Sequence, residues 1–146
     1  MLKTLSIRNV VLIDSLDIDF SGGLTVLSGE TGAGKSILLD SLGLLLGSRS
    51  ESSLVRTGAD KLSVTGVFEV RPDNKIYDIA AEYDLEVDGD IIIKRTISAD
   101  GRGKILFNDQ IITLKLLREL SRCLIEIHGQ HDLSLIHISE PTRLQL

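Results

Sequence analysis

The chain has 146 residues, 42% of them hydrophobic, and a formal net charge of −5 from 16 Lys and Arg against 21 Asp and Glu. This length and apolar content suit one domain with a buried core, and the acidic balance excludes a broad basic surface for nucleic acid, so that any DNA contact must be local or built by another part. The single cysteine excludes an internal disulfide and suits a reducing cytosol. No apolar run reaches the roughly 18 residues that a membrane-spanning helix needs.

The first third of the sequence predicts strands, a glycine-rich loop and a buried helix. Residues 2–9 alternate loosely and predict a first strand, while residues 12–20 alternate more clearly. In this second strand the apolar set is Leu12, Leu16, Ile18 and Phe20, and the outward acidic set is Asp17 and Asp19. Residues 24–29 predict a short buried strand. Residues 36–46 are apolar on nearly every face, which predicts a helix between sheet layers, and Gly47 is expected to end it.

The middle of the chain continues with a surface connection, a strand and a helix. The polar stretch 47–61 predicts the connection, and residues 62–70 predict the strand, which Arg71-Pro72 closes. Residues 74–83 predict a helix, because four apolar or aromatic residues recur at helical spacing. They are Ile76, Ile79, Ala80 and Tyr83.

The last part predicts a hairpin, a helix and a final strand. Residues 90–98 and 104–108 flank the glycine-rich turn "ADGRG" and predict the hairpin. Residues 113–122 predict a short helix with Thr113 as its N-cap, and its inward residues are Leu114, Leu117 and Leu120. Residues 123–129, "CLIEIHG", predict a further strand. The expected fold class is therefore α/β or α+β.

A glycine loop breaks the apolar pattern between residues 27 and 39. The run Gly29-Glu30-Thr31-Gly32-Ala33-Gly34-Lys35-Ser36 matches G-x-x-x-x-G-K-[ST] without gaps. Small residues let successive N–H groups converge on phosphate oxygens, and a helix that begins near Gly34 adds its positive end. Lys35 supplies charge for the β- and γ-phosphates, and the Ser36 hydroxyl is available to Mg²⁺. These eight residues, with Ile37 after them, are the candidate nucleotide-binding residues.

A chance match is the alternative interpretation of this loop. Four constrained positions predict such a match in a chain of this length on the order of one per cent of the time. The predicted strand before the loop and the predicted helix after it also fit the motif. A hydrolase of this class needs an acidic residue after an apolar strand, yet no run of four apolar residues followed by Asp-Glu occurs in the sequence. The chain therefore has a phosphate cradle without its catalytic partner.

The pattern "LSIRNVVLIDSLDIDFSGGLTVLSGETGAGKSILLDSLGLLLGSR" resembles the N-terminal ATPase half of SMC-like proteins, and "LVRTGADKLSVTGVFEV" and "LIEIHGQHD" extend the resemblance to about Asp132. It implies the N-terminal lobe of an ABC-type P-loop ATPase head, a mixed sheet around a buried P-loop helix. It also implies ATP binding in DNA double-strand break repair and recombination. Gln130 would be the Q-loop glutamine that reaches Mg²⁺ and the attacking water. Lys35 and Gln130 are thus the candidate catalytic residues, and Ser36 and Gln130 the candidate Mg²⁺ ligands.

The resemblance further implies partners that lie outside this chain. In such proteins two halves, joined by a long coiled coil, form one head, and two heads sandwich ATP. ATP and Mg²⁺ are the expected ligands; the partners are the C-terminal half, a second head and DNA, with no membrane, in the bacterial cytoplasm and at the nucleoid. The lobe is expected to span residues 1–132. Residues 133–146, which resemble the translated read-through of a sequencing adapter, are expected to be a non-native or disordered tail.

Other residues have weaker functional interpretations. His128 and His131 could suggest a metal, although ligand spacing is poor, and Cys123 is expected to be a small buried hydrophobe. The best local basic patch is the hairpin set Lys94, Arg95, Arg102 and Lys104. Four more polar residues could approach DNA, a second head or the nucleotide, although solvated roles are expected; they are Arg49, Arg56, Arg8 and Asn9.

Two other functions stay open from the sequence. One is a self-contained P-loop switch or kinase, although neither an arginine-rich lid nor N-K-x-D occurs. The other is an interaction module with a vestigial loop.

Overall fold

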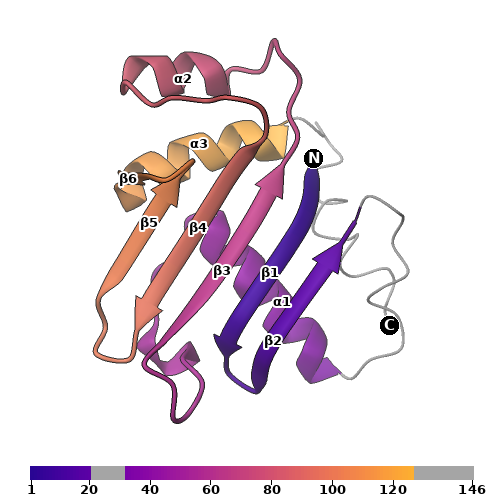
Figure 1. Cartoon of the computed structure of the whole chain (residues 1–146), viewed down its shortest axis with the longest axis vertical. Helices are drawn as coiled ribbons and strands as arrows, with labels where there is room; N and C mark the ends of the chain where they lie inside the picture. Colours follow the sequence, from indigo (N-terminus) through magenta and orange to yellow (C-terminus); the bar gives the residue numbers. More distant parts are fainter. Residues whose placement is uncertain (21–31, 127–146) are drawn as a thin grey trace.

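The computed structural model describes residues 1–20 and 32–126. In this part of the chain six strands form one sheet in the order β2-β1-β3-β4-β5-β6 (Figure 1). The strands are β1 (Leu2–Val10), β2 (Ile13–Asp19), β3 (Lys61–Phe68), β4 (Ile91–Ser98), β5 (Gly103–Phe107) and β6 (Gln110–Ile112). The helices are α1 (Gly32–Leu45), the short 3₁₀ turn η2 (Ser52–Leu54), α2 (Ile76–Glu82) and α3 (Leu114–Glu126). Every strand pairing in the sheet is antiparallel.

The sheet has one buried face and one open face because its residues alternate. Leu5, Leu62 and Ile93 are fully buried and belong to the core beneath α1 and α3, which lie on the same side of the sheet in Figure 1. On the open face, Thr65 is paired with both Ser6 and Lys94 across β1, β3 and β4. An antiparallel sheet with one solvated face gives this apolar-in, polar-out alternation.

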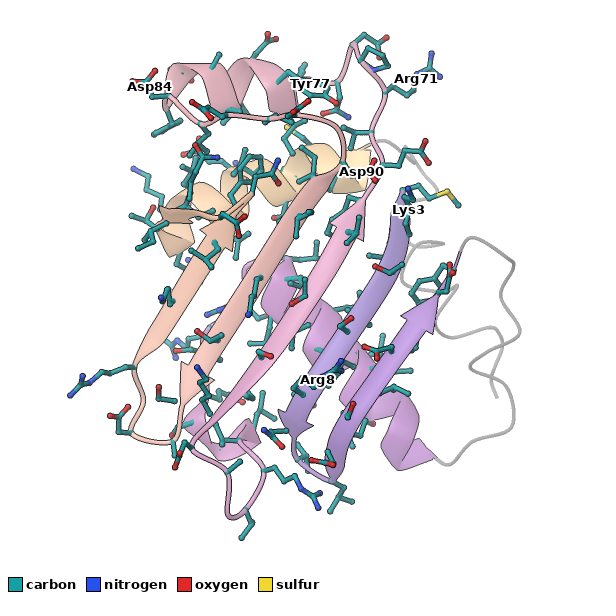
Figure 2. All side chains as sticks on the ribbon, viewed as in Figure 1. Lys3, Arg8, Arg71, Tyr77, Asp84 and Asp90 are labelled. Carbon is teal, nitrogen blue, oxygen red and sulfur yellow. The ribbon has the colours of Figure 1, made fainter. Side chains whose placement is uncertain are left out.

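Ion pairs lie along the polar face and edge of the sheet. Lys3 Nζ is 3.0 Å from Asp90 Oδ2, at the end of β1 that Figure 2 shows next to Asp90. At the other end Arg8 Nη1 is 3.0 Å from Asp17 Oδ1 on β2. The hydrogen bond from Arg8 holds the pKa of the Asp17 carboxyl below its ordinary value. Because both side chains are well exposed, solvent screens this pair.

Helix α1 lies close against the sheet where β3 has a glycine. A Cβ atom at Gly66 would stand 2.6 Å from Leu45 Cδ1 and 3.0 Å from Phe68 Cε1. A glycine inside a strand often marks such a close approach. The last turn of α1 can therefore reach the centre of the sheet only because residue 66 has no side chain.

Most of the predicted elements are confirmed. The α/β class, the first two strands, residues 62–70 as a strand and residues 74–83 as a helix agree with the structure within a few residues at each end. The hairpin around "ADGRG" is β4–β5, and Thr113 is the N-cap of α3, because its Oγ1 accepts a hydrogen bond from Leu116 N at 3.1 Å. The strand expected at 24–29 lies outside the described residues.

Three details differ from expectation. Leu12 is 73% exposed because it belongs to the tight β1–β2 turn, where Val11 has φ +51°. The predicted strand 123–129 is wrong for Cys123–Glu126, which continue helix α3, while residues 127–129 lie outside the described part. Helix α1 is predicted to lie between two sheet layers, but among the described residues it contacts one sheet only. Leu39 on its outer side is 38% exposed.

Candidate nucleotide-binding site

The described part of the phosphate loop is the beginning of α1. Gly32, Ala33, Gly34, Lys35 and Ser36 form its first turns, so the second half of the motif is helical, as the sequence predicts. The first four N–H groups of a helix have no partner within it and carry its positive end. The first turn contains no acidic residue that would compete for these groups. This end of α1 can accept an anion.

The candidate residues differ in how much of them the structure describes. Ser36 is exposed, which leaves its hydroxyl accessible, whereas Ile37 is only 6% exposed and its side chain belongs to the core. Gly29, Glu30, Thr31 and Gln130 lie outside the described residues. A triphosphate and Mg²⁺ fit what is described, since a helix N-terminus and the exposed hydroxyl of Ser36, a possible Mg²⁺ ligand, occur at one helix end.

The body of α1 is fixed by burial. Leu38, Leu42, Leu44 and Leu45 are all at most 6% exposed. Ser41, also fully buried, satisfies its hydroxyl by donating to Ile37 O at 2.9 Å. The helix that presents the loop is therefore part of the core.

The C-terminal end of α1 is closed by a glycine motif. Gly47 has φ +104°, and its N–H donates to Leu44 O, while Ser48 N donates to Gly43 O at 2.9 Å. These two bonds define a Schellman motif, with Gly47 at the left-handed position. The expectation that Gly47 ends this helix is confirmed.

Side chains from the sheet and from α3 also donate to carbonyl groups at this end. Arg95 of β4, only 3% exposed, donates to Leu44 O at 2.9 Å and also to Ser48 O. From α3, Arg118 Nε donates to Gly47 O at 2.8 Å and Ser121 Oγ donates to Leu46 O at 3.0 Å. Because the C-terminal end of a helix is electronegative, two cations there stabilise α1. We call Arg95, Arg118 and Ser121 the α1 clamp.

The environment of Arg95 differs from the sequence expectation. The sequence predicts a basic patch of Arg95 with Lys94, Arg102 and Lys104 on the hairpin, but Arg95 points to the buried face while its neighbour Lys94 is exposed. Burial, and then the charge of Arg118, lower the pKa of the Arg95 guanidinium. The strand alternation could have revealed this role, since Arg95 occupies an inward position between Ile93 and Ile97.

The other weak candidates have ordinary contacts where they are described. Arg56 Nη1 donates to Leu12 O at 2.9 Å and so holds the β1–β2 turn, and Arg49 is exposed. Cys123 is buried, as expected, although on a helix. His128 and His131 lie outside the described residues, and within those residues no three His, Cys, Asp or Glu side chains gather into a metal site. Because α3 continues to Glu126, residues 123–126 on the N-terminal side of Gln130 are helical and do not form the predicted strand.

None of the described helices combines the length and the apolar character that crossing a membrane requires.

Comparisons with known proteins agree with this fold. The chain is 41% identical to the DNA repair protein RecN of Bacillus subtilis (strain 168) over 147 aligned residues, which cover 100% of this chain and 25% of that protein. It is 44% identical to RecN of Vibrio cholerae over 135 residues, 90% of this chain and 24% of that protein. The chain thus spans about a quarter of the length of these relatives.

A solved structure and a family model extend the comparison. The structure comes from work on ATP-driven dimerization and DNA-stimulated activation of SMC ATPases; it superposes with a TM-score of 0.66 at 20% identity, covering 92% of this chain and 89% of that one. The predicted resemblance to SMC-like ATPase heads is confirmed at the level of fold, and these relatives do not favour a self-contained switch or kinase. The model of the AAA domain matches residues 4–140. The chain therefore belongs to the AAA domain family.

Proposed function

We propose that this chain is the ATP-binding part of a RecN-like ATPase head that acts in DNA double-strand break repair and recombination. The observation that carries the proposal is the motif Gly29–Ser36, whose second half forms the first turns of α1, a helix with one face buried in the core and its far end held by the α1 clamp. A helix packed into the core holds its N-terminal N–H groups in place, so that little reorganisation is needed when an anion binds.

Each candidate residue has a chemical role in this proposal. Lys35 would neutralise charge on the β- and γ-phosphates, and the backbone from Gly29 to Lys35 would donate to phosphate oxygens. The Ser36 hydroxyl, with Gln130, would hold Mg²⁺, which would spread the phosphate charge. Gln130 would also orient water, but a carboxamide is not a useful base at neutral pH.

Turnover would therefore require groups from outside this chain. The acidic residue would come from a C-terminal half, and further charge stabilisation from a second head in an ATP-dependent dimer. DNA as the substrate, and a place at the nucleoid, rest on the similarity to RecN.

Nucleotide binding can be tested by titrating the purified chain with a fluorescent ATP analogue, with and without Mg²⁺. We expect weak binding that Lys35→Ala lowers by about tenfold or more, because one charge-assisted contact is lost. Ser36→Ala should remove the benefit of Mg²⁺. Lys61→Ala, which removes an exposed lysine at the start of β3, is the matched control and should change neither affinity nor melting temperature.

Turnover provides the second test. We expect no ATP hydrolysis by the chain alone, restored hydrolysis when the C-terminal half of B. subtilis RecN is added, and reduced hydrolysis with Gln130→Ala. Strong hydrolysis by the chain alone that disappears with Lys35→Ala would contradict the proposal and favour a self-contained enzyme.

A further inference from the structure

A basic groove lies between α2 and α3, the two helices that Figure 1 shows side by side at one end of the sheet. Its volume is about 560 Å³. The lining residues are Lys75 and Ile79 from the α2 segment, and Lys115, Arg118, Glu119, Arg122 and Cys123 from α3. We call this set the α2–α3 groove.

The groove is a fixed feature because both of its walls are anchored. On α3, Leu117, Leu120 and Leu124 are buried in the core, which turns the opposite stripe of the helix outward. Asn74 connects α2 to α3. Its Nδ2 donates to Cys123 O on α3 at 3.5 Å, and its Oδ1 accepts from Ile76 N at the start of α2 at 2.8 Å.

The charge of the groove is opposite to that of the chain. Four cationic side chains and one carboxylate line it, whereas the whole sequence has a net charge of −5. Within residues 1–20 and 32–126, Lys75, Lys115 and Arg122 are exposed and take part in no ion pair. Cations that outnumber the carboxylate four to one attract an anion.

The geometry favours a polyanion that is distinct from the nucleotide. Arg118 donates to Gly47 O, so the groove borders the C-terminal end of α1, while the phosphate loop lies at the N-terminal end. A helix of 14 residues separates these ends by about 21 Å. Lys115 and Arg122 are about 10 Å apart along α3, so their long side chains can reach more than one phosphate of the same DNA strand.

We propose that the α2–α3 groove binds the phosphate backbone of nucleic acid. Lys115, Arg118 and Arg122 contact successive phosphates of one strand, and Lys75 contacts the same backbone from the opposite wall. Such contacts position a duplex without reading its sequence. The choice of nucleic acid as the polyanion rests on the proposed DNA repair function. The groove and its charge are observed independently of that function.

The test measures binding of a short fluorescein-labelled DNA duplex to the 146-residue chain by fluorescence anisotropy. The groove variant combines Lys115→Glu with Arg122→Glu and keeps Arg118, so that the α1 clamp stays intact. The matched control combines Lys94→Glu with Lys104→Glu, which changes the charge equally on the open face of the sheet. Circular dichroism melts check that both variants fold.

We expect the groove variant to raise the Kd for DNA about tenfold or more at about 50 mM salt, and the control about twofold or less. Between about 50 and 200 mM salt, the groove variant should also lower the slope of log K against log salt by about 2. Equal weakening by both variants, or no binding of DNA by the unmodified chain, would overturn the proposal. So would binding of a labelled oligoglutamate of equal charge as tightly as DNA, since the groove would then suit an acidic protein.

A parallel titration with the ATP analogue separates this inference from the proposed function. The groove variant should keep the ATP affinity of the unmodified chain. If the unmodified chain fails to bind ATP while DNA binding still depends on Lys115 and Arg122, the proposed function fails and the groove assignment stands.

Discussion

Gly47 combines two constraints at a single residue. Its φ of +104° belongs to the left-handed region that glycine tolerates best. A Cβ atom there would also stand 2.5 Å from Arg118 Cγ, in the side chain whose Nε donates to Gly47 O. The end of α1 and the position of Arg118 therefore both require that residue 47 has no Cβ atom.

Gly47→Ala should lower the free energy of unfolding by about 2 to 4 kcal/mol, because backbone strain adds to a displaced Arg118. Gly58→Ala is the matched control: its φ is +92°, but a Cβ atom there meets nothing within 4 Å. It should cost only about 1 kcal/mol. Urea unfolding of both variants checks this, and equal losses would show that the Arg118 contact is unimportant.

Gly66→Ala should lower the free energy of unfolding by about 1 to 3 kcal/mol, since Leu45 and Phe68 would have to move. Gly103→Ala, also in a strand, meets only Thr96 O at 3.5 Å and should be nearly neutral, within about 1 kcal/mol. Differential scanning calorimetry would compare the two variants. A neutral Gly66→Ala would mean that α1 can shift away from the sheet without loss.

Among the elements, helix α3 shows best how far local sequence predicts structure. Its start was predictable, because Thr113 and the leucine spacing are local signals. Its end was not: Cys123–Glu126 read equally well as a short apolar strand, and periodicity alone cannot distinguish the two. Burial of Cys123 and Leu124 against the sheet decides for the helix.

Strand β6 and the α1 clamp are two further features that local sequence does not predict. β6 has three residues, and its turn Asn108-Asp109 has two positive φ values, which fit a type I′ turn without the usual glycine. Arg95 is recognised as a helix-binding residue only when Leu44 O and Ser48 O lie beside it, and they are more than 40 residues away. By contrast, the phosphate loop is local in sequence, so its motif was visible directly.

Thr113→Ala should destabilise α3 and lower the free energy of unfolding by about 0.5 to 2 kcal/mol, because Leu116 N loses its capping partner. Thr57→Ala, which alters an exposed threonine in the connection before β3, is the control and should change the value by about 0.5 kcal/mol or less. Amide exchange can localise the effect. An unchanged exchange rate at Leu116 would contradict the capping role.

For the molecule as a whole, a single core joins the sheet to α1, α2 and α3 within residues 1–20 and 32–126. Deletion of residues 133–146 should therefore leave the melting temperature and the amide-exchange protection of residues 36–46 unchanged. Deletion of residues 114–146 is the contrasting change, because it removes Leu117, Leu120 and Leu124 from the core. If the shorter deletion also exposed residues 36–46 to exchange, the tail would have a structural role.

The strand order has a consequence for synthesis of the chain on the ribosome. β1 pairs with β3, so Thr4 cannot pair with Val67 until the intervening residues have been synthesised. These residues include the phosphate loop and α1. At about 5 to 20 residues per second, one edge of β1 stays unpaired for roughly 3 to 12 seconds after it leaves the ribosome. An unpaired strand edge is a template for association with other chains. The candidate phosphate loop thus delays closure of the sheet, and the nascent chain depends on β2 alone to protect β1 during that interval.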